Sequence, residues 1–177
     1  SRFRDLIRRR AEGVPVAYLI GRKEFYALTF TVSNAVLIPR PDSEFVVVEF
    51  LTRYKSVESP RIVDVGTGSG CLALSCLHGH LTATAIAIDI SEPALAVART
   101  NAETLKLSER VQFRLGNRLD PVAFEGPFDA IISNPPYVNA ESMATLPEEY
   151  RREPRLALAS GEDGLDFARI ILAEAAE

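Results

Sequence analysis

The chain has 177 residues, of which 47% are hydrophobic, 8% aromatic and 25% charged. This composition is typical of a globular protein with one buried core and argues against a disordered or fibrous chain. The net charge of −4 argues against non-specific electrostatic binding of nucleic acid, because a negatively charged protein repels a polyanion. The charge is uneven: residues 1–60 carry ten basic and seven acidic side chains, and residues 61–177 carry ten basic and seventeen acidic ones.

The cysteine and histidine content predicts no metal site and no disulfide. Cys71 and Cys76 are five residues apart, which places them about 140° apart around a helix. Cys76, His78 and His80 lack a second cluster of ligands, so a helix end at Gly79 is favoured over a metal centre. No apolar run has the length of a membrane span, and the Arg-rich start lacks the features of a signal peptide. We therefore expect a reduced, cytoplasmic protein without membrane contact.

The first sixty residues predict a helix, a hairpin and a second helix. Residues 2–12 form a short basic helix with its apolar side chains on one side. Residues 24–38 alternate aromatic or β-branched residues with small and polar ones, which predicts a β-hairpin or meander around Ser33 and Asn34. A helix with a broad apolar surface then runs to about Lys55.

From residue 61 onward, short apolar strands alternate with amphipathic helices. Such alternation implies right-handed crossovers and a parallel sheet, so the predicted fold class is α/β. A polar segment over residues 138–164, with a short helix near residues 141–150, is long enough to predict a lid or substrate loop. The predicted strands span residues 61–65, 82–89, 111–115 and 128–133, and the predicted helices span residues 71–77 and 91–105, with a further helix from about Leu165.

A glycine-rich turn, Gly66–Gly70, follows the first of these strands, where ligands bind in an open parallel sheet. Its alternate glycines let the backbone turn tightly and approach a ligand without a Cβ in the way. Cys71 stands where a dinucleotide fingerprint needs its third glycine, and no Gly-Lys-Ser/Thr follows to make a P-loop. The spacing is similar instead to motif I of S-adenosylmethionine-dependent methyltransferases. An ordinary strand-to-helix turn is the alternative interpretation.

Polar residues also follow the next two strands. Asp89 closes the strand over residues 82–89, where its carboxylate can accept hydrogen bonds from both hydroxyls of a ribose. The alternative is a simple helix cap before Ser91. Gly116 and Asn117 follow the third strand, at the position where an adenine ring would be recognised. Together with the glycine turn, these residues predict a cofactor that contains a nucleoside.

The most specific signal in the chain is Asn134-Pro135-Pro136-Tyr137, directly after the fourth strand. The two prolines stiffen the backbone and hold the Asn amide and the Tyr ring in fixed directions. The Asn134 side-chain oxygen and the Pro135 carbonyl can accept both hydrogens of a planar nitrogen and favour charge developing on it during methyl transfer. Tyr137 can stack against the planar group. A rigid turn with an aromatic plug is the alternative interpretation.

With these motifs, the chain resembles the HemK/PrmC family of protein-(glutamine-N5) methyltransferases, which modify the glutamine of the Gly-Gly-Gln motif in peptide-chain release factors. Other amino-methyltransferases share the two short motifs, so three longer stretches narrow the resemblance: residues 13–44, with Ile-Pro-Arg-Pro-x-Ser-Glu, residues 89–102 and residues 152–167. The resemblance implies a Rossmann-like methyltransferase fold, S-adenosylmethionine as cofactor and a release factor as protein partner. From the net negative charge we expect no direct contact with nucleic acid.

The resemblance also implies roles for individual residues. Those implied to bind S-adenosylmethionine are Gly66, Thr67, Gly68, Ser69, Gly70, Asp89, Asn117, Arg118 and Asn134. Those implied to hold the glutamine amide are Asn134, Pro135, Pro136 and Tyr137, with Asn134, Pro135 and Tyr137 as the catalytic set. Four residues are implied either to line the cofactor pocket or to shape the link between the hairpin and the helix: Pro39, Arg40, Pro41 and Glu44. Asn117 stands where family members often carry an acidic residue, although its amide can still hydrogen-bond to adenine.

By the same resemblance, the chain divides into three parts. Residues 1–14 are the end of an N-terminal helical domain, residues 15–41 a linker with a β-hairpin, and residues 42–177 the catalytic domain. Family members continue with further strands, so we expect a catalytic domain that is incomplete at its C-terminal end.

Two other functions are compatible with parts of the pattern. An N6-adenine or N2-guanine methyltransferase of DNA or RNA could use the same Asn-Pro-Pro-Tyr motif, because an exocyclic amine resembles a carboxamide. The excess of acidic residues in 61–177 argues against a groove that binds nucleic acid. A non-catalytic protein that only binds the cofactor or the release factor is the second alternative. The presence of both Asn134 and Tyr137 argues against it, because such a protein has no need of that pair.

Overall fold

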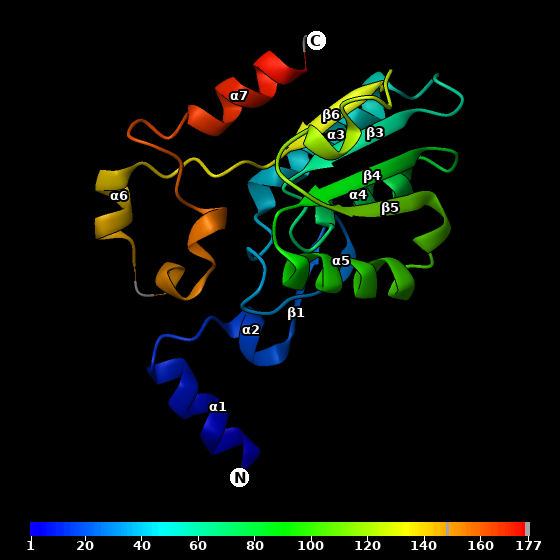
Figure 1. Ribbon diagram of the computed structural model, residues 1–177. Helices are drawn as coiled ribbons and strands as arrows, with labels where there is room; N and C mark the ends of the chain where they lie inside the picture. The colour runs from blue at the N-terminus through cyan, green and yellow to red at the C-terminus, as the bar shows by residue number, and fades with distance from the viewer. Residues whose placement is uncertain (148, 176–177) are drawn as a thin grey trace.

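The computed structural model describes residues 1–147 and 149–175. Its centre is a four-stranded parallel sheet in the order β5-β4-β3-β6 (Figure 1). The expected α/β class and all four expected strands are confirmed. The chain adds β4 and β5 on one side of β3 and then places β6 on the other side, so the strand order reverses between β3 and β6. The strands are β3 (Arg61–Val65), β4 (Thr84–Asp89), β5 (Val111–Leu115) and β6 (Ala130–Ser133).

Apolar side chains bury both faces of the sheet, as a parallel sheet requires. Ile62, Ala85 and Ala87 face a core shared with α3 (Glu44–Arg53), α4 (Cys71–Gly79) and α5 (Glu92–Thr104). Alternate residues of the same strands, including Val63, Val65, Ile86 and Ile88, face a smaller core on the other side. That core includes Ile171 of α7 (Asp166–Glu174), together with Leu119 and Val122.

The N-terminal part contains α1 (Arg2–Ala11), α2 (Val16–Ile20) and a hairpin of β1 (Arg22–Phe25) and β2 (Leu28–Thr31). The expected hairpin is present, and a turn does form at Ser33 and Asn34, where Val36 N donates to Ser33 O at 3.1 Å. That turn follows β2, so the expectation that the hairpin folds around it is wrong. The chain turns at Tyr26 and Ala27, which adopt φ of 48° and 57°, although neither is a glycine. The flanking Phe25 and Phe30 are buried in the core, and Glu44 Oε1 accepts a hydrogen bond from Tyr26 N at 2.9 Å. These tertiary contacts fix the turn where local sequence preference does not.

The remaining segments are mostly short turns of 3-10 helix. They are η1 (Pro41–Ser43), η2 (Ser108–Arg110), η3 (Asp120–Val122), η4 (Tyr150–Arg152) and η5 (Arg155–Ala157). The helix expected near residues 141–150 is shorter: α6 covers Ala140–Thr145, and Pro147 follows closely. In the described part of the chain, no helix combines the length and the apolar character that crossing a membrane requires.

Asn101 of α5 connects the hairpin to the glycine-rich turn. Its side chain is 1% exposed. Its Nδ2 donates to Thr31 O at 3.0 Å and to Ser69 O at 2.8 Å, and its Oδ1 accepts from Thr31 N at 2.7 Å. Thr31 is at the end of an edge strand, so the amide satisfies backbone groups that the two-stranded sheet leaves open.

We expect Asn101→Ala to lower the free energy of unfolding by about 2–4 kcal/mol, because it removes a buried side chain whose amide bonds the buried Ser69 carbonyl and both backbone groups of Thr31. The neighbouring Thr100→Ala is the control, since Thr100 is exposed and its hydroxyl donates to Ala96 O of its own helix. Chemical denaturation of both variants measures the difference. An Asn101→Ala variant as stable as Thr100→Ala contradicts the assigned role.

Candidate active site

A cleft lies at the carboxyl edge of the sheet and encloses about 1030 Å³, open solvent included. Because the strands are parallel, the residues after them meet at this one edge. The order across the cleft follows the strand order: Asn117 after β5, Asp89 at the end of β4, the glycine turn after β3, and Asn134 after β6. The structure thus brings together residues from each motif that the sequence placed after a strand.

The glycine turn runs along the floor of the cleft. Gly66 N and Thr67 N both donate to Ile88 O at 2.9 Å, which ties the turn to the neighbouring strand. Gly66 and Gly68 have φ of +71° and +56°, in the left-handed region that favours glycine. No described atom lies within 4 Å of the Cβ that a substitution would add at either position. The backbone of the turn is therefore bare toward the cleft.

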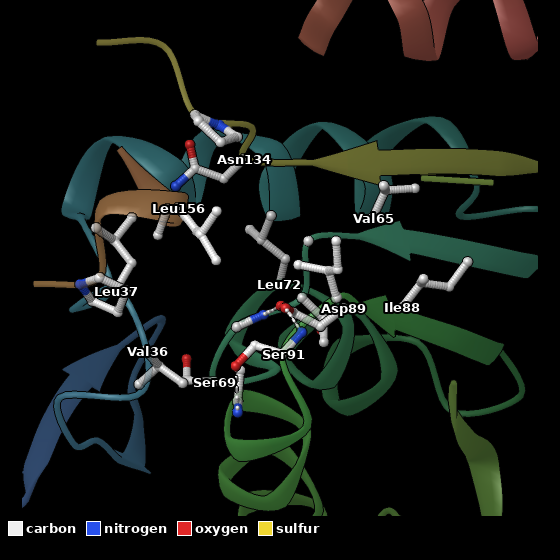
Figure 2. A pocket seen from close by; sticks show the side chains of 18 of the residues that line it. Val36, Leu37, Val65, Ser69, Leu72, Ile88, Asp89, Ser91, Asn134 and Leu156 are labelled. Atoms are coloured by element: carbon white, nitrogen blue, oxygen red, sulfur yellow. Dashed lines mark hydrogen bonds between the residues drawn. The ribbon is translucent and has the colours of Figure 1, made fainter. Parts of the chain in front are cut away.

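Asp89 joins this turn to the start of α5 (Figure 2). Its Oδ2 accepts from Gly68 N at 2.8 Å and its Oδ1 accepts from Ser91 N at 3.0 Å. The helix cap is supplied by Ser91, whose Oγ accepts from Ala94 N at 3.3 Å. The carboxylate is half-buried and lines the cleft, so each oxygen still has lone pairs for a ligand.

The Asn-Pro-Pro-Tyr segment leaves the sheet on the opposite side of the cleft. Ser133 Oγ donates to Val65 O at 2.7 Å, which holds the end of β6 beside the end of β3. Asn134 and Pro136 line the cleft, and Figure 2 shows the Asn134 carboxamide pointing into it. Pro135 is not among the lining residues, and Tyr137 is 61% exposed at the surface.

The other expected site residues divide into two groups. Thr67, Ser69, Arg118, Pro39 and Arg40 line the cleft. Gly70, Pro41 and Glu44 do not. A Cβ at Gly70 would meet Leu74 Cδ1 at 3.0 Å and Ala98 Cβ at 3.3 Å, so this glycine permits close packing of α4 and α5. Glu44 bonds the hairpin turn at Tyr26, which is the linking role and not the pocket-wall role.

Comparison with known protein families identifies the core of the chain. A family model described as a methyltransferase small domain matches residues 42–160, more than half of the 177 residues. The chain belongs to the methyltransferase small domain family. The expected Rossmann-like methyltransferase fold is thereby confirmed.

This methyltransferase small domain is similar to curated relatives named release factor glutamine methyltransferase. The relative from Moorella thermoacetica is 47% identical over 99% of this chain and 62% of its own length. The relative from Bacillus subtilis is 45% identical over 94% of this chain and 59% of its own. The chain thus spans about 60% of the length of these relatives.

Solved structures share the fold. The hMettl16 catalytic domain, crystallised with the MAT2A 3′UTR hairpin 6, matches with a TM-score of 0.68 and 16% sequence identity, covering 85% of this chain and 57% of that one.

Several residues that line the cleft were not found from the sequence. Leu37 follows the hairpin, Leu156 belongs to the segment after α6, and Phe167 lies in the first turn of α7. Figure 2 shows Leu37 and Leu156 on the same side of the cleft as Asn134. An isolated leucine or phenylalanine has no sequence pattern that separates a cleft wall from a core position. Only the fold brings these three segments together.

Asp64 is a fully buried carboxyl group directly beneath the glycine turn. Its Oδ2 accepts from Thr67 Oγ1 at 2.6 Å and from Ala73 N at 3.3 Å, whereas its Oδ1 has no hydrogen-bond partner among the described residues. Burial raises the pKa of Asp64 from 3.8 to about 6, and the hydrogen bond from Thr67 only partly offsets this. The negative charge of Asp89 raises it slightly further.

Asp64 makes the stability of the methyltransferase small domain depend on pH. Because its folded-state pKa is raised, its contribution is complete below its ordinary pKa of 3.8 and is lost as pH rises through about 6. Relative to Asp64→Asn, we expect the wild-type free energy of unfolding to fall by about 3 kcal/mol between about pH 4 and pH 7. Denaturation of both proteins across this range measures the effect. A difference that is constant with pH contradicts it.

Proposed function

We propose that this chain is the catalytic part of an enzyme that transfers a methyl group from S-adenosylmethionine to the side-chain amide nitrogen of a glutamine in a release factor. The observation that carries the proposal is the position of Asn134: its carboxamide points into the cleft across from the glycine turn. The curated relatives named release factor glutamine methyltransferase support the choice of substrate.

The cleft residues fit S-adenosylmethionine. The bare backbone at Gly66 and Gly68 leaves room for the amino-acid part of the cofactor against the turn. The Asp89 carboxylate can accept hydrogen bonds from the ribose, and Asn117 lies one strand further along for the adenine. When bound, the cofactor supplies an electrophilic methyl group on a sulfonium.

Arg118 lies beside this adenine end. It pairs with Glu174 of α7, whose Oε2 also accepts from Leu119 N at 3.4 Å. We infer that Arg118 braces the end of the cleft against α7, so that its part in cofactor binding is to hold the wall.

The residues after β6 fit a planar amide. Asn134 is half-buried, so its side-chain oxygen can accept one N–H of a glutamine amide away from bulk water, and the Pro135 carbonyl can accept the other. Both bonds strengthen as the amide nitrogen gains positive charge, which favours the transition state over the ground state. The exposed Tyr137 ring can stack on the amide plane as the substrate enters.

One labelling experiment with several acceptor substrates separates this function from the alternatives. The complete gene product is incubated with radiolabelled S-adenosylmethionine and, separately, with a release factor, its Gly-Gly-Ala variant, tRNA, rRNA and DNA. We expect label only in the release factor with an intact Gly-Gly-Gln motif. Label in a nucleic acid and none in the release factor would overturn the proposal, and binding of the cofactor without any transfer would support a non-catalytic protein.

Asn134→Ala tests the assigned chemistry. We expect cofactor affinity within a few-fold of the wild type and a loss of most turnover, because the removed hydrogen bond acts on the amide and not on the cofactor. Calorimetry with S-adenosylhomocysteine measures the first quantity, and single-turnover methylation measures the second. A variant that no longer binds S-adenosylhomocysteine would place Asn134 in cofactor binding instead.

A further inference from the structure

Glu153 is a buried carboxylate that the chemistry described above does not use. Its side chain is 3% exposed. Its Oε2 accepts from Ile38 N at 2.9 Å, and its Oε1 pairs with the guanidinium of Arg40, so both oxygens have partners. Burying a carboxylate is costly unless it is paired and hydrogen-bonded. These contacts therefore fix where the main chain around Glu153 can lie.

The contacts of Glu153 join two walls of the cleft. Leu37, Pro39 and Arg40 line the wall that follows the hairpin, and Pro154 and Leu156 line the wall that follows η4. Glu153 stands between them, and it is 115 residues from Ile38 in the chain. The Cζ of Arg40 also lies 4.9 Å from the centroid of the Tyr150 ring, which adds a second contact between the two walls.

The segment that begins at Glu153 also holds the chain directly after the Asn-Pro-Pro-Tyr motif. Val138 N donates to Leu158 O at 2.8 Å, and Ser160 N donates to Val138 O at 3.0 Å. Gly164 packs against the carbonyl of Tyr137 so closely that a Cβ would lie 2.3 Å from that oxygen. A continuous set of contacts thus runs from the hairpin linker through Glu153 to the exit of the motif.

We propose that Glu153 is a positioning residue: its buried carboxylate fixes residues 153–160 to the linker and thereby sets the position of the Asn134–Tyr137 motif over the cleft. The hydrogen bonds of Glu153 go to Ile38 and Arg40, and the segment that it anchors pairs with Val138 directly after the motif, so its role concerns the amide side of the site. The expected effect of Glu153 on methyl transfer rests on the proposed function, whereas its effect on the position of residues 153–160 does not.

The chain offers a matched control in the same segment. Glu149 pairs with Arg10 of α1, but the two side chains are 48% and 41% exposed. An exposed ion pair contributes little to stability, so Glu149→Gln removes the same charge without removing a buried anchor. Glu153→Gln keeps the size of the side chain and removes the charge that faces Arg40.

The first experiment is hydrogen exchange of the complete gene product. We expect Glu153→Gln to speed amide exchange at Ile38, Val138 and Ser160 by about tenfold or more, with the amides of β3 and β4 unchanged. Glu149→Gln should match the wild type at all of these amides. Wild-type exchange at Val138 and Ser160 in Glu153→Gln, or an equal increase throughout the sheet, would overturn the positioning role.

The second experiment is kinetic. We expect Glu153→Gln to lower kcat/KM for the release factor by about tenfold or more, with the dissociation constant of S-adenosylhomocysteine within about threefold of the wild type. A purely structural role would weaken cofactor binding by a similar factor, and that outcome contradicts the proposal. If wild-type protein methylates no release factor but the exchange pattern is found, the proposed function fails and the positioning role stands.

A second variant covers the case in which Glu153→Gln does not fold. Arg40→Met/Glu153→Gln removes both charges together and leaves no unpaired charge in the interior, so it avoids the main cost of breaking the pair. We expect the same local increase in exchange at Val138 and Ser160. Wild-type exchange at both amides in this double variant would overturn the proposal.

Discussion

The site depends on one constraint, the parallel pairing of β3 with both β4 and β6. Val65 is in register with Ile88 on one side and with Ser133 on the other, so these three strands end at the same level. The residues at the ends of these strands therefore lie close together: the glycine turn, Asp89 and Asn134 all project from one edge of the sheet. The strand order reverses between β3 and β6 and the cleft opens at that point, because the connection from β3 to β4 runs over one face of the sheet through α4, whereas the connection from β5 to β6 packs Leu119 and Val122 on the other face.

Three buried polar side chains then hold the parts of the cleft in place. Asp64 bonds the underside of the glycine turn, Asn101 bonds the turn to the hairpin, and Glu153 bonds the linker to the segment that follows η4. Each is at most 5% exposed, so its hydrogen bonds form away from competing water. Among the ligand-facing groups, Gly66 and Gly68 present bare backbone, and the side chains of Asp89 and Asn134 are half-buried. Rigid support therefore lies beneath the cleft, while the surface that meets a ligand stays open.

The part of the site that could be predicted is the part encoded locally. Gly66–Gly70, Asp89 and Asn134 each follow an apolar strand directly, and the rule that ligands bind at the carboxyl edge of a parallel sheet was sufficient to group them. Leu37, Leu156 and Phe167 could not be predicted. They lie on segments far apart in the chain, and an apolar residue has the same local signature in a core as in a cleft.

The sequence by itself determined the fold class, the four strands and the chemical character of the residues after them, because strand periodicity and turn composition are local properties. Tertiary structure alone decided the hairpin turn at Tyr26 and Ala27, where burial of Phe25 and Phe30 outweighs an unfavourable φ. It also decided the pairing of Glu153 with Ile38 and Arg40. These partners are more than a hundred residues from Glu153 in the chain, and only the packing of the two segments against each other brings them together, so no sequence window contains that information.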